Sequence, residues 1–197
     1  MLVMKTREDK KQEIIKKGSE IMHRKGYNAT GVKDIVDAAG IPKGSFYNYF
    51  ESKEDFVIQA LQYSADHCNT IMGETLRDRS LPPLQRIEKF YEERIIQFTE
   101  CDFTLGCFGS NLCIEMGDIS LPIGAATEAY FKRLESVLLS CLQEAQDAGD
   151  LDKEKNIDKL AQFIYNSWNG AVLRMKASRS PEPLNIFREM LTEVLFR

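Results

Sequence analysis

The chain has 197 residues, of which 43% are hydrophobic and 28% are charged. This composition is typical of a folded globular protein and excludes an intrinsically disordered chain, which lacks the apolar residues to form a core. No apolar run approaches the roughly 20 residues of a membrane span, and residues 1–17 are too charged for a signal peptide. We therefore expect a cytoplasmic protein with no membrane partner.

The net charge of −4 is unevenly distributed along the chain. Residues 1–60 contain 11 Lys and Arg against 9 Asp and Glu, a net charge of +2, which leaves −6 for the remainder. A nucleic-acid partner would therefore face the N-terminal part of the chain. A difference of this size is also common on solvated surfaces, so it supports a nucleic-acid partner only together with other evidence.

The cysteines do not form a disulfide framework or a metal site in this sequence. They are odd in number and widely spread, and the two histidines stand in different segments. No pair has the C-x-x-C spacing typical of zinc ligands. We expect free thiols, no metal and no cofactor. The five positions are Cys68, Cys101, Cys107, Cys113 and Cys141.

Two amphipathic helices are predicted at the start of the chain. In residues 6–25, isoleucine and methionine recur at near-helical spacing, and the pattern stops at Gly26. The second helix spans residues 30–39. Thr30 is placed to cap it, and Asp34 in its first turn complements the helix dipole.

A turn and a third helix follow directly. Gly40 permits a left-handed conformation, and Pro42 pre-sets the first turn of a helix over residues 43–50. A helix-turn-helix needs two short helices joined at a steep angle by a turn that contains glycine, so that the second helix can lie in the DNA major groove. Residues 30–50 match this arrangement.

The helix predicted over residues 43–50 has two different faces. Phe46 and Phe50 are four residues apart and can pack on the preceding helix. A short aromatic-rich helix can be simply part of a core, but its opposite face has polar residues without packing partners. That face favours DNA reading, and it carries Lys43, Ser45, Tyr47 and Asn48.

The rest of the chain is also predicted to be helical. Ser52 opens a capping box for a fourth helix that runs to about residue 72, and runs of alternating residues at strand spacing are absent. The fold class is therefore all-α, with a helix-turn-helix domain at residues 1–55 joined by the fourth helix to a helical ligand-binding and dimerisation domain at residues 56–197. The later helices are expected over residues 82–99, 104–116, 121–148, 157–177 and 184–196.

The stretch from Thr30 to Phe56 resembles the DNA-binding domain of TetR-family repressors nearly throughout. It combines the second helix, the turn, the sequence Gly44-Ser-Phe-Tyr-Asn-Tyr-Phe and the sequence Ser52-Lys-Glu-Asp-Phe at the spacing of that family. The similarity covers about residues 10–60 and is highly specific. Tyr49 departs from the pattern, because many relatives have a histidine there; the resemblance therefore does not extend to the operator preference, whereas DNA binding is still expected.

The resemblance implies particular DNA contacts. Residues at the start of the third helix would approach base edges or the nearby backbone, namely Lys43, Gly44, Ser45, Tyr47 and Asn48. Others would hold phosphates, namely Thr30, Lys33, Tyr49 and Lys53. For the lysines, a solvated helix surface is the alternative. The basic stretch Lys5–Lys17 is interleaved with acidic residues, so we expect only a minor role for it along the DNA backbone.

A dimer is expected, because helix-turn-helix proteins bind two half-sites of DNA. The last two predicted helices carry a broad apolar stripe that could form a four-helix interface, as in the resembled family. Part of the stripe must instead belong to the core of the subunit. The interface is predicted to include Ile157, Leu160, Ile164, Trp168, Val172, Met175, Phe187, Met190, Leu191 and Val194.

A small molecule or an electrophile could act on the body of the protein. Phe90, Phe108, Tyr130 and Trp168 are available to line a pocket, although ordinary core packing is the alternative. If Thr104 caps the helix over residues 104–116, Cys107 lies in its first turn, where the helix dipole favours a thiolate.

The segment around Cys107 also resembles a TetR subgroup that includes the N-ethylmaleimide-reductase repressor. This resemblance implies that the protein senses oxidants or electrophiles through Cys107, with Cys113 as a second candidate. A buried, inert cysteine is the alternative.

The function expected from the sequence is transcriptional regulation. The protein would repress by binding a palindromic operator in double-stranded DNA as a homodimer, and a small-molecule inducer or cysteine modification would release it. An activator and a helical interaction protein without DNA affinity are the alternatives. The sequence has no triad-like, phosphate-loop or metal-ligand spacing, so an enzyme is not expected.

Overall fold

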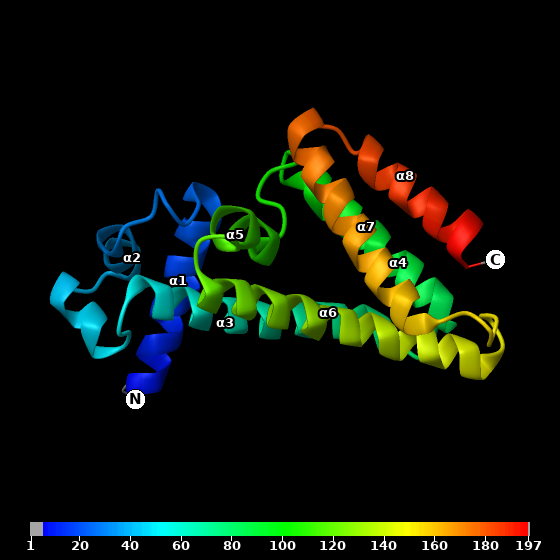
Figure 1. The fold of residues 1–197 in the computed structure, drawn as a ribbon, viewed down its shortest axis with the longest axis horizontal. Helices are drawn as coiled ribbons and strands as arrows, with labels where there is room; N and C mark the ends of the chain where they lie inside the picture. The colour runs from blue at the N-terminus through cyan, green and yellow to red at the C-terminus, as the bar shows by residue number, and fades with distance from the viewer. Residues whose placement is uncertain (1–5, 197) are drawn as a thin grey trace. The chain divides into compact units, whose positions relative to one another are not determined.

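The computed structural model describes residues 6–196, and every regular element in that range is helical (Figure 1). No helix of this part of the chain is both long and apolar enough to cross a membrane. The elements are α1 (Arg7–Lys25), α2 (Val32–Ala39), the 3₁₀ helix η1 (Lys43–Asn48), α3 (Lys53–Leu76), α4 (Pro83–Glu100), α5 (Phe108–Met116), α6 (Leu121–Ala148), α7 (Ile157–Ser178), α8 (Glu182–Met190) and the π-helical turn η2 (Leu191–Leu195).

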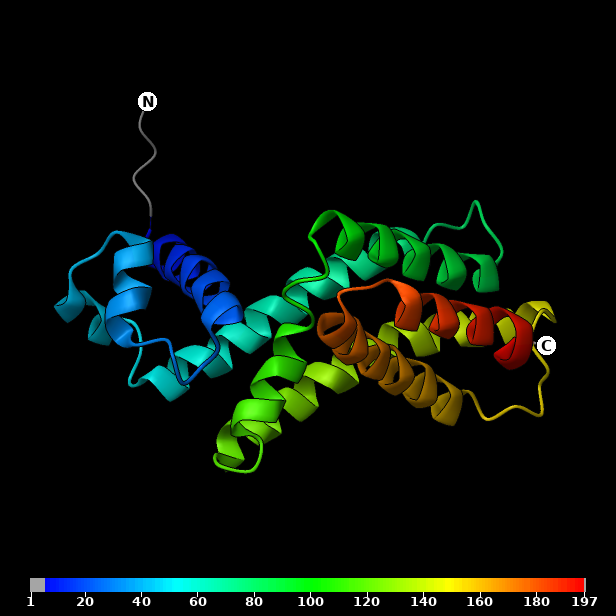
Figure 2. The same cartoon turned by 90° about the horizontal axis from the view of Figure 1, so that it is seen from above.

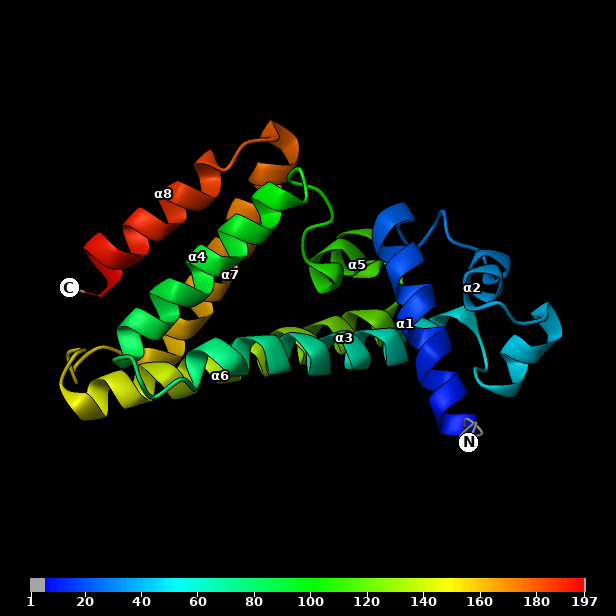
Figure 3. The same cartoon turned by 180° about the vertical axis from the view of Figure 1, so that it is seen from behind.

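The chain forms two compact units. Unit 1 consists of the residues up to Ala65 together with Phe108–Tyr130, and unit 2 consists of Asp66–Cys107 together with the residues from Phe131 onward. The boundary expected after residue 55 therefore differs from the compact units, because α3 continues past it and α5 belongs to unit 1. Figure 3 shows α5 lying beside α1.

Local capping explains where α1 begins and ends. The Thr6 side chain accepts from the backbone N–H of Asp9, and the Asp9 carboxylate accepts from the backbone N–H of Thr6. At the other end, Gly26 has a φ of 86°, which glycine adopts without strain. Between these ends, Ile14 and Met22 face the core.

The second helix begins one residue later than the sequence predicted, at Val32 after Gly31. The Asp34 carboxylate accepts from the backbone N–H of Gly31 at 2.8 Å and so caps the helix. Thr30 does not cap it, because its hydroxyl donates to the Gly26 carbonyl. The expected third α-helix is a 3₁₀ helix, η1, in which the N–H of Ser45 donates to the Pro42 carbonyl.

Three phenylalanines hold η1 in place. The ring centroids of Phe46 and Phe50 are 5.0 Å apart, and those of Phe50 and Phe56 are 5.1 Å apart. All three side chains are at most 1% exposed. Gly18 of α1 lets the Phe56 ring approach closely, because a Cβ at Gly18 would lie 2.6 Å from that ring. The aromatic cluster therefore joins α1, η1 and α3.

Unit 2 has an aromatic core of its own. Tyr91 of α4 packs on Trp168 of α7 and on Phe187 of α8, with both centroid distances at 4.8 Å. Figure 2 shows α8 alongside α7 and α4. The buried Arg86 donates to the Leu76 carbonyl at 2.8 Å and to the Glu144 carboxylate at 2.7 Å. These two bonds tie the ends of α3 and α6 to α4.

The aromatic cluster yields a first prediction. Truncating Phe46 to alanine removes a fully buried ring, and such a change costs about 3–5 kcal/mol of unfolding free energy. Tyr47→Ala is the matched control, because that side chain is 59% exposed and surface substitutions stay within about 0.5 kcal/mol. Chemical denaturation of both variants measures the difference. Equal stability of the two would show that the cluster does not support η1.

Candidate nucleic-acid interface

The two faces of η1 differ sharply in exposure. Phe46 is fully buried, whereas Tyr47 is 59% exposed, and Lys43, Gly44 and Asn48 are also exposed. In a 3₁₀ helix, residues three apart lie on the same side, so Gly44 sits beside Tyr47. Of the expected reading residues, Lys43, Gly44, Tyr47 and Asn48 are thus open to contact from outside, and Ser45 is half-buried.

Gly44 is not required by the fold itself. A Cβ built at Gly44 would meet no atom within 4 Å, and its φ is not positive. The glycine leaves the backbone of η1 accessible for a close approach from outside. This arrangement suits a groove-binding element.

Basic residues of α1 lie at the end of η1. Arg7 donates to the Asn48 carbonyl, and its guanidinium carbon is 5.8 Å from the centroid of the Tyr49 ring. Lys11 lies 5.7 Å from the Phe50 ring centroid. The sequence predicted only a minor role for this stretch, because acidic residues interrupt it, and its contacts with residues 48–50 are tertiary. Lys5 of the same stretch lies outside the described residues.

Lys33 and Lys53 both have partners within the chain. The Lys33 ammonium pairs with Asp37 at 2.5 Å on an exposed surface, and this pairing raises the pKa of Lys33. The Lys53 ammonium donates to the Tyr27 carbonyl and lies 3.9 Å from the centroid of the Tyr27 ring. Partial burial lowers the pKa of Lys53. The Lys33 ammonium therefore lies on an open surface, whereas contacts with Tyr27 hold the Lys53 ammonium in place.

Thr30 does not fit the role expected for it. Its side chain is completely buried, and its hydroxyl donates to the Gly26 carbonyl at 2.7 Å. A phosphate cannot reach a hydroxyl in that position. Thr30 instead closes the loop between α1 and α2, and this corrects its assignment as a phosphate ligand.

A carboxylate from α5 reaches the same loop. Glu115 accepts from the backbone N–H groups of Tyr27 and Asn28, each at 3.1 Å. The N-terminus of α6 is tied to the start of α3 in a similar way, because the Ser120 hydroxyl donates to the Glu54 carboxylate at 3.1 Å. Sequence reasoning assigned Glu115 no role in DNA binding, since 87 residues separate it from Asn28 along the chain.

Cys107 does not lie within the first turn of a helix. The helix α5 begins at Phe108, and the Thr104 hydroxyl donates to the Cys101 carbonyl instead of capping a helix. Cys107 is half-buried at the end of a loop in which Phe103 and Leu105 have φ values of 56° and 68°. The argument from its position in the first turn is therefore wrong, although the residue still immediately precedes a helix.

The other cysteines differ in exposure. Cys101 is exposed and Cys113 is half-buried within α5. Cys141 is buried, its thiol donates to the Pro83 carbonyl at 3.3 Å, and burial raises its pKa to about 11.

The aromatic residues proposed to line a pocket are divided between the two units. In unit 1, the Phe108 ring lies 5.5 Å from the His23 ring, and Tyr130 lies against Gly109. In unit 2, Phe90 and Trp168 both pack on Tyr91. All four side chains are buried by neighbours of their own.

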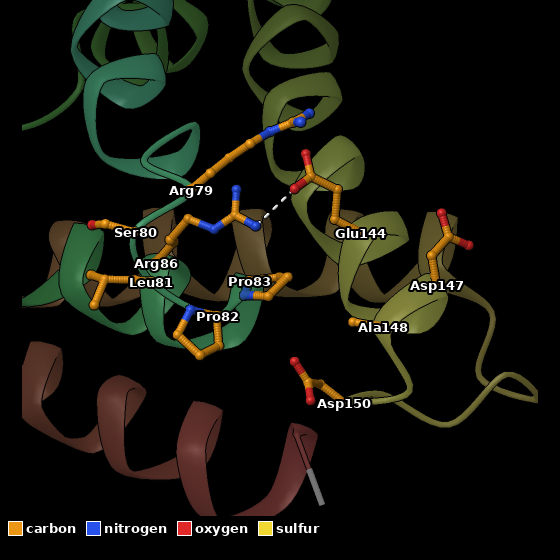
Figure 4. Close-up of a pocket in the computed structure, with 10 residues that line it drawn as sticks. All are labelled: Arg79, Ser80, Leu81, Pro82, Pro83, Arg86, Glu144, Asp147, Ala148 and Asp150. Atoms are coloured by element: carbon orange, nitrogen blue, oxygen red, sulfur yellow. Dashed lines mark hydrogen bonds and ion pairs between the residues drawn. The ribbon is translucent and has the colours of Figure 1, made fainter.

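Unit 2 has an open pocket of about 670 Å³ with a charged lining (Figure 4). Arg86 and Glu144 form its ion pair, and Asp147 and Asp150 lie at the end of α6. None of the aromatic candidates lines it. Sequence reasoning missed this pocket because its walls come from a loop and two helix ends. The lining residues are Arg79, Ser80, Leu81, Pro82, Pro83, Arg86, Glu144, Asp147, Ala148 and Asp150.

Most of the predicted interface residues lie in the core of unit 2. Their side chains are at most 9% exposed, so they are not available to contact a second subunit. This corrects their assignment to the dimer interface. These buried positions are Ile157, Ile164, Trp168, Val172, Met175, Phe187 and Leu191. Leu160 is half-buried, whereas Met190 and Val194 are 50% and 53% exposed. The sequence pattern missed Phe163 and Leu173, which are 57% and 53% exposed, whereas Ile186, which belongs to the apolar stripe of the last helix, is 53% exposed.

Two family models match the chain. The model described as "Bacterial regulatory proteins, tetR family" matches residues 14–60, which include α2 and η1, and the model described as "Tetracyclin repressor-like, C-terminal domain" matches residues 83–191. Together they span both the candidate interface and most of unit 2.

Individual proteins are similar to this chain over nearly its whole length. The transcriptional repressor DhaR of Mycobacterium sp. (strain GP1) is 35% identical over 94% of this chain and 91% of its own. A crystal structure of the regulatory protein TetR from Rhodobacter sphaeroides is 32% identical and covers 91% of this chain and 95% of its own, with a TM-score of 0.83.

A crystal structure of Escherichia coli NemR in its reduced form has a TM-score of 0.87 at 26% identity, covering 94% of this chain and 96% of its own. These relatives are transcriptional regulators and not enzymes. The chain belongs to the TetR family and is a DNA-binding transcriptional regulator.

Proposed function

We propose that the protein is a repressor that binds a palindromic operator as a homodimer and is released when a small molecule or an electrophile acts on unit 2. The open face of η1 carries the proposal, because Tyr47 and Gly44 are exposed there without a role in the fold. The relatives DhaR and NemR are named as transcriptional repressors, which supports repression over activation.

The proposed DNA contacts follow from the exposure of each residue. Base edges are met by the face of η1 that carries Lys43, Gly44, Ser45, Tyr47 and Asn48. Phosphates are met by Lys33, Tyr49 and Lys53 at its margins. Phosphate contacts position the protein, and base contacts give it sequence preference.

The proposed dimer surface consists of the exposed apolar side chains of α7, α8 and η2. Phe163 and Leu173 project from α7, and Ile186, Met190 and Val194 project from the neighbouring segment 182–195. Two packed helices with apolar outer faces fit a four-helix interface with the same surface of a second copy. Gly170 on α7 is exposed with open space around it, which permits close contact.

Cys107 is the proposed electrophile-sensitive residue. It is half-buried beside a loop with three non-glycine residues at positive φ, and such positions store conformational energy that a modification can release. The similar structure of NemR is described as the reduced form, which supports a thiol-based trigger. The charged pocket around Arg86 is the site proposed for a small-molecule inducer.

The reading face predicts the effect of Tyr47→Ala. Loss of an exposed aromatic side chain at a base edge lowers affinity for the selected operator by about tenfold and leaves thermal stability unchanged. Anisotropy titrations at several salt concentrations measure the affinity, which falls steeply as salt rises. Ile119→Ala, 74% exposed on another element, is the control. An unchanged affinity in Tyr47→Ala would contradict the assigned face.

The dimer surface predicts the effect of Met190→Asp. A carboxylate placed in an apolar interface loses its hydration without gaining a partner, so the variant sediments as a monomer. Analytical ultracentrifugation measures the change. The control is Ile114→Asp, which alters an apolar residue of α5 that is 67% exposed and leaves the dimer intact. A dimer that persists in Met190→Asp would place the interface elsewhere.

The thiols are predicted to react with N-ethylmaleimide in order of exposure. Cys101 and Cys107 react before Cys141, which at pH 8 has a thiolate fraction of only about one in a thousand, given its pKa of about 11. Peptide mass spectrometry over time measures the order. In a separate anisotropy assay of the DNA complex, Cys107→Ser abolishes release by a quinone, and Cys101→Ser does not. Release that is unaffected by Cys107→Ser would exclude the thiol trigger.

A further inference from the structure

The loop after α1 is held by a carboxylate from a distant helix. Glu115 of α5 accepts hydrogen bonds from the backbone N–H groups of Tyr27 and Asn28 and from the Asn28 side-chain amide at 3.4 Å. Backbone N–H groups beyond a helix end need acceptors, and an ionised carboxylate is a strong one. A single side chain of α5 thus fixes two consecutive peptide groups.

The neighbouring glycine makes room for this carboxylate. A Cβ at Gly26 would lie 2.6 Å from an oxygen of Glu115, so a larger residue would displace it. The helix α5 is itself closely packed within unit 1, because a Cβ at Gly109 would lie 2.6 Å from the Tyr130 ring. Glu115 therefore projects from a firmly placed helix into a space that glycine keeps open.

Tyr27 also contacts Lys53, through both its carbonyl and its ring. Its N–H donates to Glu115, its carbonyl accepts from the Lys53 ammonium, and its ring lies 3.9 Å from that ammonium. A flexible lysine loses rotamer freedom when it is fixed, and these contacts already restrict the Lys53 side chain before any ligand binds. An ammonium has three donors, and only one is used on the carbonyl.

The charges around Lys53 are consistent with this arrangement. Partial burial lowers the pKa of Lys53, and the negative charges of Glu115 and Asp34 oppose that effect. Glu115 thus favours the protonated lysine as well as fixing the loop that holds it. A protonated ammonium is the form that binds a phosphate.

We propose that Glu115 is a positioning residue for DNA binding, which fixes the Tyr27–Asn28 loop so that the Tyr27 carbonyl holds the Lys53 ammonium ready for a DNA phosphate. This proposal rests on the proposed function. It also gives α5 a direct connection to a DNA contact. Since α5 begins at Phe108, next to Cys107 in the chain, a displacement of α5 acts on Lys53 through Glu115.

A double-mutant cycle tests the proposal. The variants Glu115→Ala, Lys53→Ala and the combination of both are titrated with a duplex selected by the wild-type protein from a random-sequence library. Each single change lowers affinity about tenfold, the size expected for a charged hydrogen bond, and the double change lowers it no further. A loss of about a hundredfold in the double variant would show independent effects and overturn the proposal.

The salt dependence separates positioning from general destabilisation. Because each subunit of the proposed homodimer contributes one Lys53, Lys53→Ala reduces the slope of log affinity against log salt by about two phosphate contacts, and Glu115→Ala reduces it equally although it removes a negative charge. Glu115→Gln keeps an acceptor for one N–H and gives an intermediate affinity, which covers the case in which Glu115→Ala folds poorly. An unchanged slope in both Glu115 variants would contradict the proposal.

Two further measurements complete the design. The exposed neighbour Asp118 supplies the control, since Asp118→Ala leaves affinity unchanged and adds nothing to Lys53→Ala. Without DNA, the Tyr27 and Asn28 amides exchange faster with solvent in Glu115→Ala, and unchanged exchange would contradict the anchoring. If the wild-type protein binds no duplex, the proposed function fails, whereas binding with independent effects of the two residues contradicts only the positioning role.

Discussion

The DNA-binding face depends on the packing of Phe46, Phe50 and Phe56. A six-residue 3₁₀ helix has too few hydrogen bonds to be stable alone, so its conformation must come from tertiary contacts. The two phenylalanines at the middle and end of this segment insert against α1 and α3, and that insertion leaves Tyr47 and Asn48 on the outside. The packing that buries the phenylalanines therefore also leaves the polar residues of this segment exposed.

Three carboxylates accept hydrogen bonds at helix ends and loops of unit 1. Asp34 caps α2, Glu54 accepts from the hydroxyl at the start of α6, and Glu115 accepts from the loop after α1. Asp34 satisfies a backbone donor at the start of α2, whereas Glu54 accepts from a serine hydroxyl and Glu115 accepts from loop N–H groups that follow the end of α1. Such directional contacts specify the geometry of the loops around η1, and apolar packing alone would not.

The broad apolar pattern of the last helices includes both residues of the core and residues that stay exposed. Trp168 and Phe187 pack on Tyr91 inside unit 2, whereas Leu173 and Met190 stay exposed on the same elements. Hydrophobicity by itself does not distinguish the two sets, because both repeat at helical spacing. Only the orientation of each helix against its neighbours decides which of these residues are buried and which stay exposed.

The sequence by itself determined the all-helical fold, the approximate helix positions and the DNA-binding character of residues 30–56. These follow from local signals, namely helical periodicity, caps, and the glycine and proline of the turn, and from a contiguous motif. The pattern of aromatic and polar side chains also predicted that Phe46 and Phe50 pack inside while Tyr47 and Asn48 stay exposed, although the expected α-helix is a 3₁₀ helix.

Only the tertiary structure decided which of these residues are free to act. In the folded chain, Thr30 is buried in the loop after α1 and Cys107 lies before α5 rather than within it. Most of the apolar stripe of α7 belongs to the core. Folding also brings Glu115 to Tyr27 and Arg7 to Asn48. Contacts between residues tens of positions apart depend on how helices pack, and a local pattern carries no information about that packing.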